Sequence, residues 1–334
     1  GDLRSHSQDS RTSAVPSLRL DAFSPTRTSS FGHSGQLNLG VGLSRRASRK
    51  AVACFVSTTG SAVAGVGALG GRGRIGALYV TNELSGDFGS YTAPDRFPVV
   101  TPRGRVDPGT DERGSAVVDG SLAEAGEALL LFVHGFGTDD PTARDQAFAT
   151  ASGLEAIRPL PVAAYSWDSD REWEPAKAMA DANGPVLADW LIEWADTDGR
   201  PVHVVGYSLG ARVVCRALFA LALAGRGDAA ASVSLLGGAI PHDSVARDTP
   251  YGEAIHQLDS PVTNFHNADD RVLGWLYRLS DRSRAVGATG ISDPAAAPAG
   301  YTDVDVTDTV ADHYSYFEPG EGCLPQLADR LPSV

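Results

Sequence analysis

The chain contains few of the residues that disulfide scaffolds and metal sites require. Its 334 residues include three cysteines, eight histidines and one methionine. Three cysteines are too few for a disulfide framework, and no C-x-x-C or H-E-x-x-H motif marks a metal site, so we expect no bound metal. Aromatic residues make up only 7% of the chain, but the apolar fraction of 42% provides a sizeable core and excludes global disorder.

Lysine is almost absent, and the charge is distributed unevenly. Residues 1–74 carry a net charge of +7, whereas residues 75–334 carry 18 basic and 38 acidic side chains, a net charge of −20. A domain with this charge repels nucleic acids and anionic membranes, so neither is an expected partner. The excess of Asp over Glu indicates a surface adapted to high salt, with a merely acidic protein from a GC-rich genome as the alternative.

The first seventy residues have the composition of a tail followed by a targeting segment. Residues 1–43 are rich in Ser, Arg, Gly and Pro without periodicity, which predicts disorder. Because the chain does not begin with Met, we expect it to be a fragment or to begin upstream of the true start. In residues 44–70, Arg45 and Arg46 precede a weakly apolar stretch with too many small residues for a stable membrane span, and the pattern resembles a twin-arginine signal. We therefore expect export to the cell envelope or the medium, with an uncleaved N-terminal anchor as the alternative.

Residues 71–334 are predicted to form a single α/β domain. Short apolar runs alternate with amphipathic stretches, which is typical of a mostly parallel sheet with helices on both faces. Strands are predicted at 129–134, 162–167, 202–207, 233–236 and 262–266, with an edge strand near 301–306 and antiparallel strands at the other edge within 75–106. Helices are predicted at 142–154, 185–194, 208–223 and 271–279, and a loop at 280–300. Only about 25 residues separate the strands ending at 236 and starting at 262, too few for a large lid domain.

The pentapeptide Gly206-Tyr-Ser-Leu-Gly210 stands between an apolar strand and an amphipathic helix. The G-x-S-x-G pattern requires this context, because the strand must turn sharply into the helix and hold the serine at the apex. The helix N-terminus then directs free N–H groups towards a developing oxyanion. Ser208 is therefore the candidate nucleophile, with a structural turn serine as the alternative.

A His-Gly turn follows the strand at 129–134, and it precedes Ser208 in the chain. In serine hydrolases such a turn contributes one backbone N–H to the oxyanion hole, and the residue after the nucleophile contributes the other. Phe136 and Leu209 are the candidate donors. His134 is expected to stabilise the turn rather than act as the catalytic base, because the base follows the nucleophile in the chain order nucleophile, acid, base.

Two neighbouring carboxylates and one histidine complete the order Ser, Asp, His. Asp269 and Asp270 follow the strand at 262–266, and His313 lies in a loop before an aromatic segment. We assign Asp270 to orient His313, because it stands directly before an Arg-Val-Leu sequence. Asp269 is then expected to cap the following helix, although the two roles are interchangeable if the loop shifts by one position.

With these residues in place, the chain from about 75 to 320 resembles the α/β-hydrolase superfamily. It is most similar to a bacterial and archaeal family of uncharacterised serine hydrolases. The segments that carry the resemblance are VHGF at 133–136, YSW at 165–167, GYSLG at 206–210, DDRVL at 269–273 and DHYSY at 312–316. The resemblance implies the α/β-hydrolase fold and a Ser208–His313–Asp270 triad, but hardly a substrate.

The implied chemistry is acyl transfer to water, and it requires no cofactor. We expect a carboxylic-ester hydrolase of the EC 3.1.1 type whose partner is a small or flexible ester. A peptidase or amidase on the same fold, and a non-catalytic exported binding protein on a hydrolase scaffold, are the alternatives. Five aromatic residues either line an acyl pocket or pack in the core: Tyr165, Trp167, Trp173, Trp275 and Tyr277.

Overall fold

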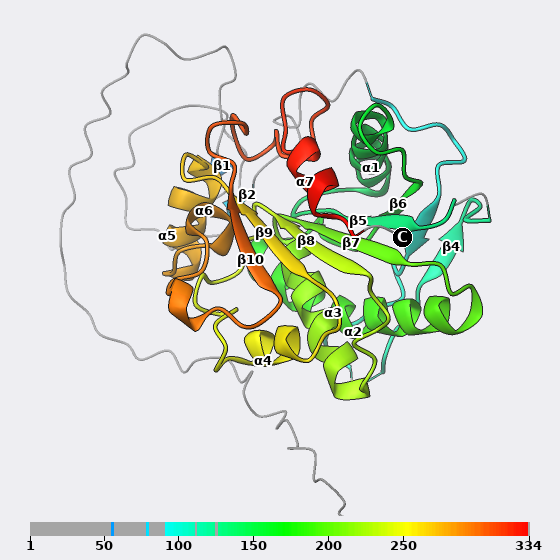
Figure 1. Cartoon of the computed structure of the whole chain (residues 1–334), viewed down its shortest axis with the longest axis horizontal. Helices are drawn as coiled ribbons and strands as arrows, with labels where there is room; N and C mark the ends of the chain where they lie inside the picture. The colour runs from blue at the N-terminus through cyan, green and yellow to red at the C-terminus, as the bar shows by residue number, and fades with distance from the viewer. Residues whose placement is uncertain (1–54, 57–77, 80–90, 111, 124–125, 333–334) are drawn as a thin grey trace, which may run out of the picture. The chain divides into compact units, whose positions relative to one another are not determined.

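The structure is a computed structural model that describes residues 55–56, 78–79, 91–110, 112–123 and 126–332 (Figure 1). The chain divides into two units, Gly1–Ala47 and Ser48–Val334, and every element below belongs to the second. The predicted tail at 1–43 and nearly all of the predicted signal at 44–70 lie outside the described residues. The domain boundaries therefore stay a prediction.

The centre of the described chain is an eight-stranded sheet with the order β10-β9-β8-β7-β5-β6-β3-β4. Neighbouring strands are parallel except for β3 and β4, which pair antiparallel at one edge. The strands are β3 (Val99–Thr101), β4 (Val117–Asp119), β5 (Leu129–Val133), β6 (Val162–Tyr165), β7 (Val202–Tyr207), β8 (Ser232–Leu236), β9 (Val262–His266) and β10 (Tyr301–Asp305). Two further strands, β1 (Phe55–Val56) and β2 (Leu78–Tyr79), pair with each other.

Helices cover both faces of this sheet (Figure 1). The α-helices are α1 (Asp140–Glu155), α2 (Trp173–Thr197), α3 (Gly210–Ala224), α4 (Pro250–His256), α5 (Arg278–Asp281), α6 (Val286–Thr289) and α7 (Leu324–Arg330). A π-helix, η3 (Val272–Tyr277), and a 3₁₀ helix, η4 (Pro294–Ala296), complete the set in the described residues.

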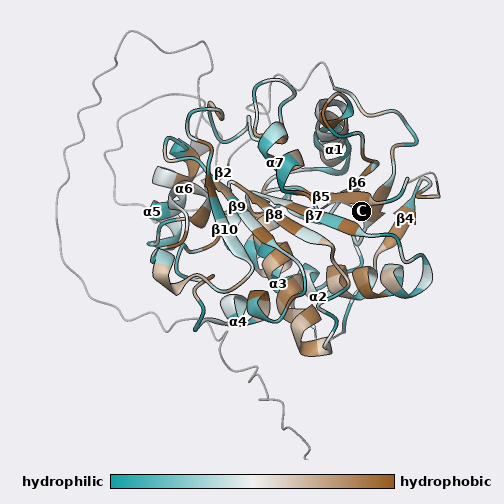
Figure 2. Cartoon of the chain, in the orientation of Figure 1, coloured by the Kyte–Doolittle hydropathy of each residue, from teal (hydrophilic) through white to brown (hydrophobic). Residues whose placement is uncertain are grey.

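Alternate side chains of the central strands face the two helical layers. Leu129, Leu131 and Val133 of β5 pack in one cluster with residues of α2 and α3. Leu130 and Phe132 pack in a second cluster with residues of α1 and α7. Because both faces are covered, the central strands are apolar along most of their length, as Figure 2 shows.

The strand order, the parallel crossovers and the strand–Ser208–helix turn make this an α/β-hydrolase fold. The predicted fold class is confirmed. The β8–β9 connection contains one short helix, α4, so the described residues include no large lid domain.

The largest error in the predicted elements concerns α2. The sequence pattern predicts a helix that starts at Pro185, because proline favours the first helical position. In the structure α2 starts at Trp173 and Pro185 lies inside it. The glycine before this proline has a packing reason, since a Cβ on Gly184 would lie 2.2 Å from the Cβ of Arg216 on α3. The Asn-Gly-Pro sequence therefore marks the close approach of two helices rather than a helix start.

Smaller differences occur at both ends of the sheet. The antiparallel pair at the predicted edge is formed by β3 and β4, so one strand lies beyond the predicted range of 75–106. The predicted helix at 271–279 is a π-helix continued by α5, and the predicted loop at 280–300 contains the short helices α6 and η4. Elements of three to six residues leave little periodicity in a sequence.

Candidate active site

Ser208 occupies a strained turn between β7 and α3. Its φ angle is +52°, a conformation that side chains with a Cβ rarely adopt. The flanking glycines are required by close contacts. A Cβ on Gly206 would lie 2.9 Å from the side chain of Val214, and a Cβ on Gly210 would lie 2.2 Å from the carbonyl oxygen of Val133. The G-x-S-x-G sequence therefore permits a turn that packs directly against β5.

His313 lies between Ser208 and Asp270. Its Nε2 is 2.9 Å from Ser208 Oγ, and its Nδ1 is 2.6 Å from Asp270 Oδ2. His313, Ser208 and Asp270 are 4%, 8% and 1% exposed, respectively. With the Nδ1 proton donated to the carboxylate, Nε2 is free to accept the proton of Ser208 Oγ. The structure thus brings together the three residues that the sequence order singled out.

Asp270 performs both tasks that the sequence analysis divided between two carboxylates. Oδ2 accepts from His313, while Oδ1 accepts from the Leu273 backbone N–H at 3.0 Å. The expectation that Asp269 caps this helix is therefore wrong. Asp269 is exposed, and its own N–H donates to Asn267 Oδ1. A carboxylate has two oxygens that accept in different directions, so one residue serves both partners.

Two tyrosines that sequence reasoning missed hold the histidine loop. Tyr207 OH donates to the His313 carbonyl oxygen at 2.8 Å, and Tyr316 OH donates to the Gly287 carbonyl oxygen at 3.2 Å. Burial raises the pKa of both phenols well above the ordinary value, so both remain protonated donors. Tyr207 is the second residue of the G-x-S-x-G pattern, but nothing in the sequence indicates this contact.

The His-Gly turn after β5 lies directly against Ser208. A Cβ on Gly135 would be 2.9 Å from Ser208 Cβ, so only glycine allows this approach. Among the described residues, neither the Phe136 N–H nor the Leu209 N–H donates to a protein acceptor. Backbone N–H groups without a protein acceptor can stabilise an oxyanion where they face it. Their role as an oxyanion hole stays a prediction.

The five aromatic residues considered for an acyl pocket do not gather in one place. Tyr165 and Trp167 are fully buried in the core. Trp173 packs edge-on against Phe136 and against Tyr277, with ring centroids 5.2 and 6.1 Å apart. Trp275 is 64% exposed. Of the five, Trp173 and Tyr277 form a group with Phe136 of the His-Gly turn.

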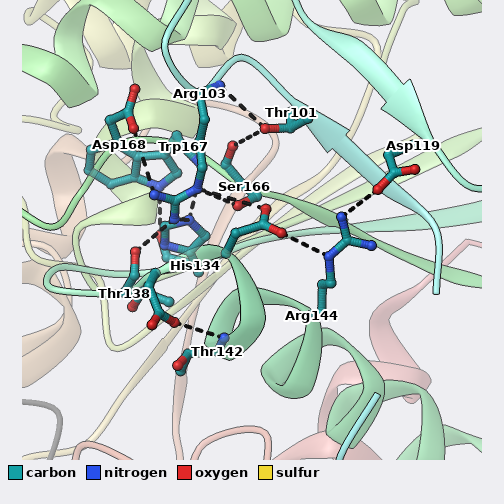
Figure 3. A network of polar contacts seen from close by, with 12 residues as sticks. Thr101, Arg103, Asp119, His134, Thr138, Thr142, Arg144, Ser166, Trp167 and Asp168 are labelled. Carbon is teal, nitrogen blue, oxygen red and sulfur yellow. Dashed lines mark hydrogen bonds and ion pairs between the residues drawn. The ribbon is translucent and has the colours of Figure 1, made fainter. Parts of the chain in front are cut away.

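A polar network around Arg103 supports the same turn and was not foreseen from the sequence (Figure 3). Arg103 comes from the connection between β3 and β4, and its guanidinium contacts Ser166, Thr138 and His134. An arginine in a connecting segment carries no motif, which is why sequence reasoning missed it. In the described part of the chain no cluster of three or more His, Cys, Asp or Glu side chains could hold a metal ion.

Residues 119–326 match the family model described as "Protein of unknown function (DUF726)". The match covers more than half of the chain. The chain belongs to the DUF726 family. Its two clusters of site residues, the His-Gly turn and the Ser208–His313–Asp270 group, both fall within the matched range.

Two curated relatives of this DUF726 chain are eukaryotic and are named as membrane proteins. The "Transmembrane and coiled-coil domain-containing protein STS1" of Oryza sativa subsp. japonica is 30% identical over 176 residues, which are 50% of this chain and 25% of that protein. The "Uncharacterized membrane protein C6F6.13c" of Schizosaccharomyces pombe is 30% identical over 199 residues, 59% of this chain and 25% of that protein. The chain thus spans about a quarter of the length of these relatives.

The prediction that the chain is exported by a twin-arginine route is wrong, because its relatives are named as membrane proteins. The relatives come from a plant and a yeast and are called membrane proteins, so they also give no support to a bacterial and archaeal family. Paired arginines before small and apolar residues are too common a pattern to identify a signal by themselves. No helix in the described residues of this DUF726 chain is long and apolar enough to cross a membrane.

A solved lipase structure is similar to part of the chain. The mature form of Bacillus licheniformis lipase BlEst2 is 18% identical, with a TM-score of 0.40, and the similarity covers 64% of this chain and 94% of the lipase. The fold assignment of the DUF726 chain rests on its own strand order and turn geometry.

Proposed function

We propose that this DUF726 chain is a serine hydrolase that uses Ser208, His313 and Asp270 as a catalytic triad. The observation that carries the proposal is the continuous hydrogen-bonded path from Ser208 Oγ through the imidazole to Asp270, at 2.9 and 2.6 Å. The positive φ of Ser208 supports it, because backbone strain of this kind persists where the surrounding structure enforces it, often at functional sites.

In the proposed mechanism Ser208 Oγ attacks a carbonyl carbon while His313 Nε2 takes the hydroxyl proton. The negative charge that develops on the carbonyl oxygen is stabilised by the N–H groups of Phe136 and Leu209, each contributing about 3 kcal/mol. The tetrahedral intermediate collapses, and His313 returns the proton to the leaving group. Water then hydrolyses the acyl-enzyme by the same steps, with Asp270 stabilising the imidazolium each time.

We propose a carboxylic ester of small or flexible shape as the substrate. The absence of a large lid in the described residues supports this proposal, because the nucleophile is then reached without opening a separate domain. Phe136, Trp173 and Tyr277 offer apolar surface next to the His-Gly turn for an acyl or alcohol group. The same triad would also cleave amides, so the choice between them depends on measured turnover.

The test uses a fluorophosphonate probe and two substrates with the same acyl group. The chain should be labelled at Ser208, and it should hydrolyse p-nitrophenyl acetate faster than the matching p-nitroanilide. Ser208→Ala is the control for labelling. A folded chain that is not labelled would refute the serine hydrolase and favour a binding protein, and faster anilide cleavage would make it an amidase.

A further inference from the structure

His134 holds the turn that carries one of the proposed oxyanion donors. Its Nδ1 lies 2.9 Å from the Gly135 carbonyl oxygen, and its Nε2 lies 3.0 Å from the Trp167 backbone N–H. A backbone N–H can only donate, so Nε2 is the unprotonated acceptor and Nδ1 carries the proton. His134 is therefore a neutral imidazole that donates to Gly135.

This hydrogen bond fixes the direction of the next N–H group. The Gly135 carbonyl and the Phe136 N–H belong to one planar trans peptide and point in opposite directions. Holding the carbonyl oxygen therefore holds the N–H. The ring itself is held in place by Trp167. The imidazole and indole rings are stacked with centroids 5.5 Å apart, and the indole Nε1 donates to the His134 carbonyl oxygen at 2.9 Å.

Arg103 closes this arrangement from the side of the β3–β4 connection (Figure 3). Its Nη2 donates to the Thr138 carbonyl oxygen at 2.7 Å and lies 3.4 Å from His134 Nε2. Its Nε donates to Ser166 Oγ at 2.6 Å. A guanidinium offers only donors and stays charged, so it favours the His134 state in which Nε2 has a lone pair and the ring has no charge.

We propose that Arg103 is a positioning residue for the oxyanion turn: its contacts with the Thr138 carbonyl oxygen and His134 Nε2 hold the turn and the ring, and so keep the Phe136 N–H aligned. The inference rests on the proposed serine hydrolase function. It assigns a role to a residue remote from the Ser208 hydroxyl, and it links the β3–β4 connection to the rate of the chemical step.

The charges around the ring determine what the loss of Arg103 should do. Burial and, second, Arg103 lower the pKa of His134 to about 3, whereas the hydrogen bond to the Gly135 carbonyl oxygen and then Asp140 and Asp139 at the start of α1 act in the opposite direction. Removing Arg103 leaves burial alone to oppose this hydrogen bond and the two carboxylates, so the pKa of His134 rises. On acidification the ring then gains a proton on Nε2, against the Trp167 N–H, at a higher pH than in the unaltered chain.

The experiment compares Arg103→Met and Arg103→Lys with Arg144→Met. Arg144 is the matched control, because its side chain is as buried as that of Arg103, at 17% against 19% exposed, and it also pairs with Asp140. It donates to Asp119 and to the Phe97 carbonyl oxygen rather than to the His-Gly turn. Both methionine variants should lose stability.

Only Arg103→Met should lower kcat for p-nitrophenyl acetate, by about 10- to 100-fold with little change in KM, since a misaligned donor loses part of the roughly 10²- to 10³-fold effect of one oxyanion contact. The acid limb of the pH profile of kcat for Arg103→Met should move to higher pH and become steeper. Arg103→Lys retains the cation and should keep the acid limb of the parent. Equal kcat values and pH profiles for Arg103→Met and Arg144→Met would overturn the inference.

A second measurement does not depend on activity. Nitrogen–proton NMR correlations of the imidazole, assigned with His134→Gln, should show a neutral ring with the proton on Nδ1 in the parent and a higher titration point in Arg103→Met. An unchanged titration overturns the inference even if the parent is active. Absence of fluorophosphonate labelling in the parent would instead refute the proposed function.

Discussion

Replacing Asp270 by asparagine should separate catalysis from stability, because both carboxylate oxygens are engaged. Oδ2 accepts from His313 Nδ1 and Oδ1 accepts from the Leu273 N–H. Asparagine has one oxygen and one NH₂ group, so it can satisfy only one of these two donors. The other donor must face the amide nitrogen.

The two orientations of the introduced amide have different consequences. If its oxygen faces Leu273, the NH₂ group donates to Nδ1 and forces the imidazole proton onto Nε2, where it faces Ser208; turnover then falls by up to about 10⁴-fold. If its oxygen faces His313, the tautomer is retained, but two donors oppose each other in the turn at a cost of about 1–3 kcal/mol in the free energy of unfolding. We expect the first orientation, because the backbone N–H is fixed and the imidazole can change its tautomer.

The assay measures kcat for p-nitrophenyl acetate and the urea-unfolding free energy of Asp270→Asn, with Asp269→Asn as the control. Asp269 is exposed, so its variant should stay within about 0.5 kcal/mol of the parent and keep its turnover. An inactive Asp269→Asn beside an active Asp270→Asn would refute the reasoning. A fully active and fully stable Asp270→Asn would refute it as well.

Three further outcomes are expected. Ser208→Ala should lower p-nitrophenyl acetate turnover by on the order of 10³-fold or more. Ser208→Gly should be equally inactive but more stable in urea than Ser208→Ala by about 1 kcal/mol, because glycine adopts the φ of +52° without strain. Equal stabilities of the two variants would mean that the turn is not strained. Gly210→Ala should destabilise the fold by about 3 kcal/mol or more, since the added Cβ would meet backbone atoms. Gly225→Ala should destabilise it by only about 1 kcal/mol, because Gly225 has a φ of +66° but open space around it. If unfolding experiments showed Gly225→Ala to be the less stable variant, the packing argument would be contradicted. Residues 75–334 carry a net charge of −20, so their carboxylates repel one another. The melting temperature should rise steeply between about 0.1 and 3 M KCl, because salt shortens the Debye length from about 10 Å at 0.1 M and screens this repulsion. An unchanged melting temperature would leave the proposed adaptation to high salt without support.

The parts of the fold that could be predicted are those with a local signal. Gly206, Ser208 and Gly210 lie within five residues, and the contacts that require the glycines follow from the turn itself. The Arg-Val-Leu sequence also favours Asp270 over Asp269 for the contact with His313, although it leaves both carboxylates open. Its second hydrogen bond could not be predicted, because it depends on how the loop turns towards η3.

Long-range packing explains what the sequence analysis missed. Arg103 contacts His134 and Ser166, which lie 31 and 63 residues away, and no spacing connects them. The start of α2 was misplaced because Pro185 was interpreted locally, whereas Gly184 is determined by α3. The export prediction depended on a short basic and apolar pattern that many unrelated segments share.

The three residues of the proposed triad are far apart in the chain, so the proposed activity requires that the domain has folded as far as the His313 loop. Ser208 and Asp270 follow strands within the sheet, but His313 comes after the last strand, and the hydrogen bond that anchors its loop joins residues 106 positions apart. During synthesis Ser208 emerges 105 positions before His313, and β10 completes the sheet only shortly before that histidine. Loops that are closed over such distances form late, because their entropy must be lost before any contact is gained. A chain released before residue 313 would therefore lack the proposed base, and the proposed ester turnover would appear only once the segment that carries His313 has docked against Tyr207.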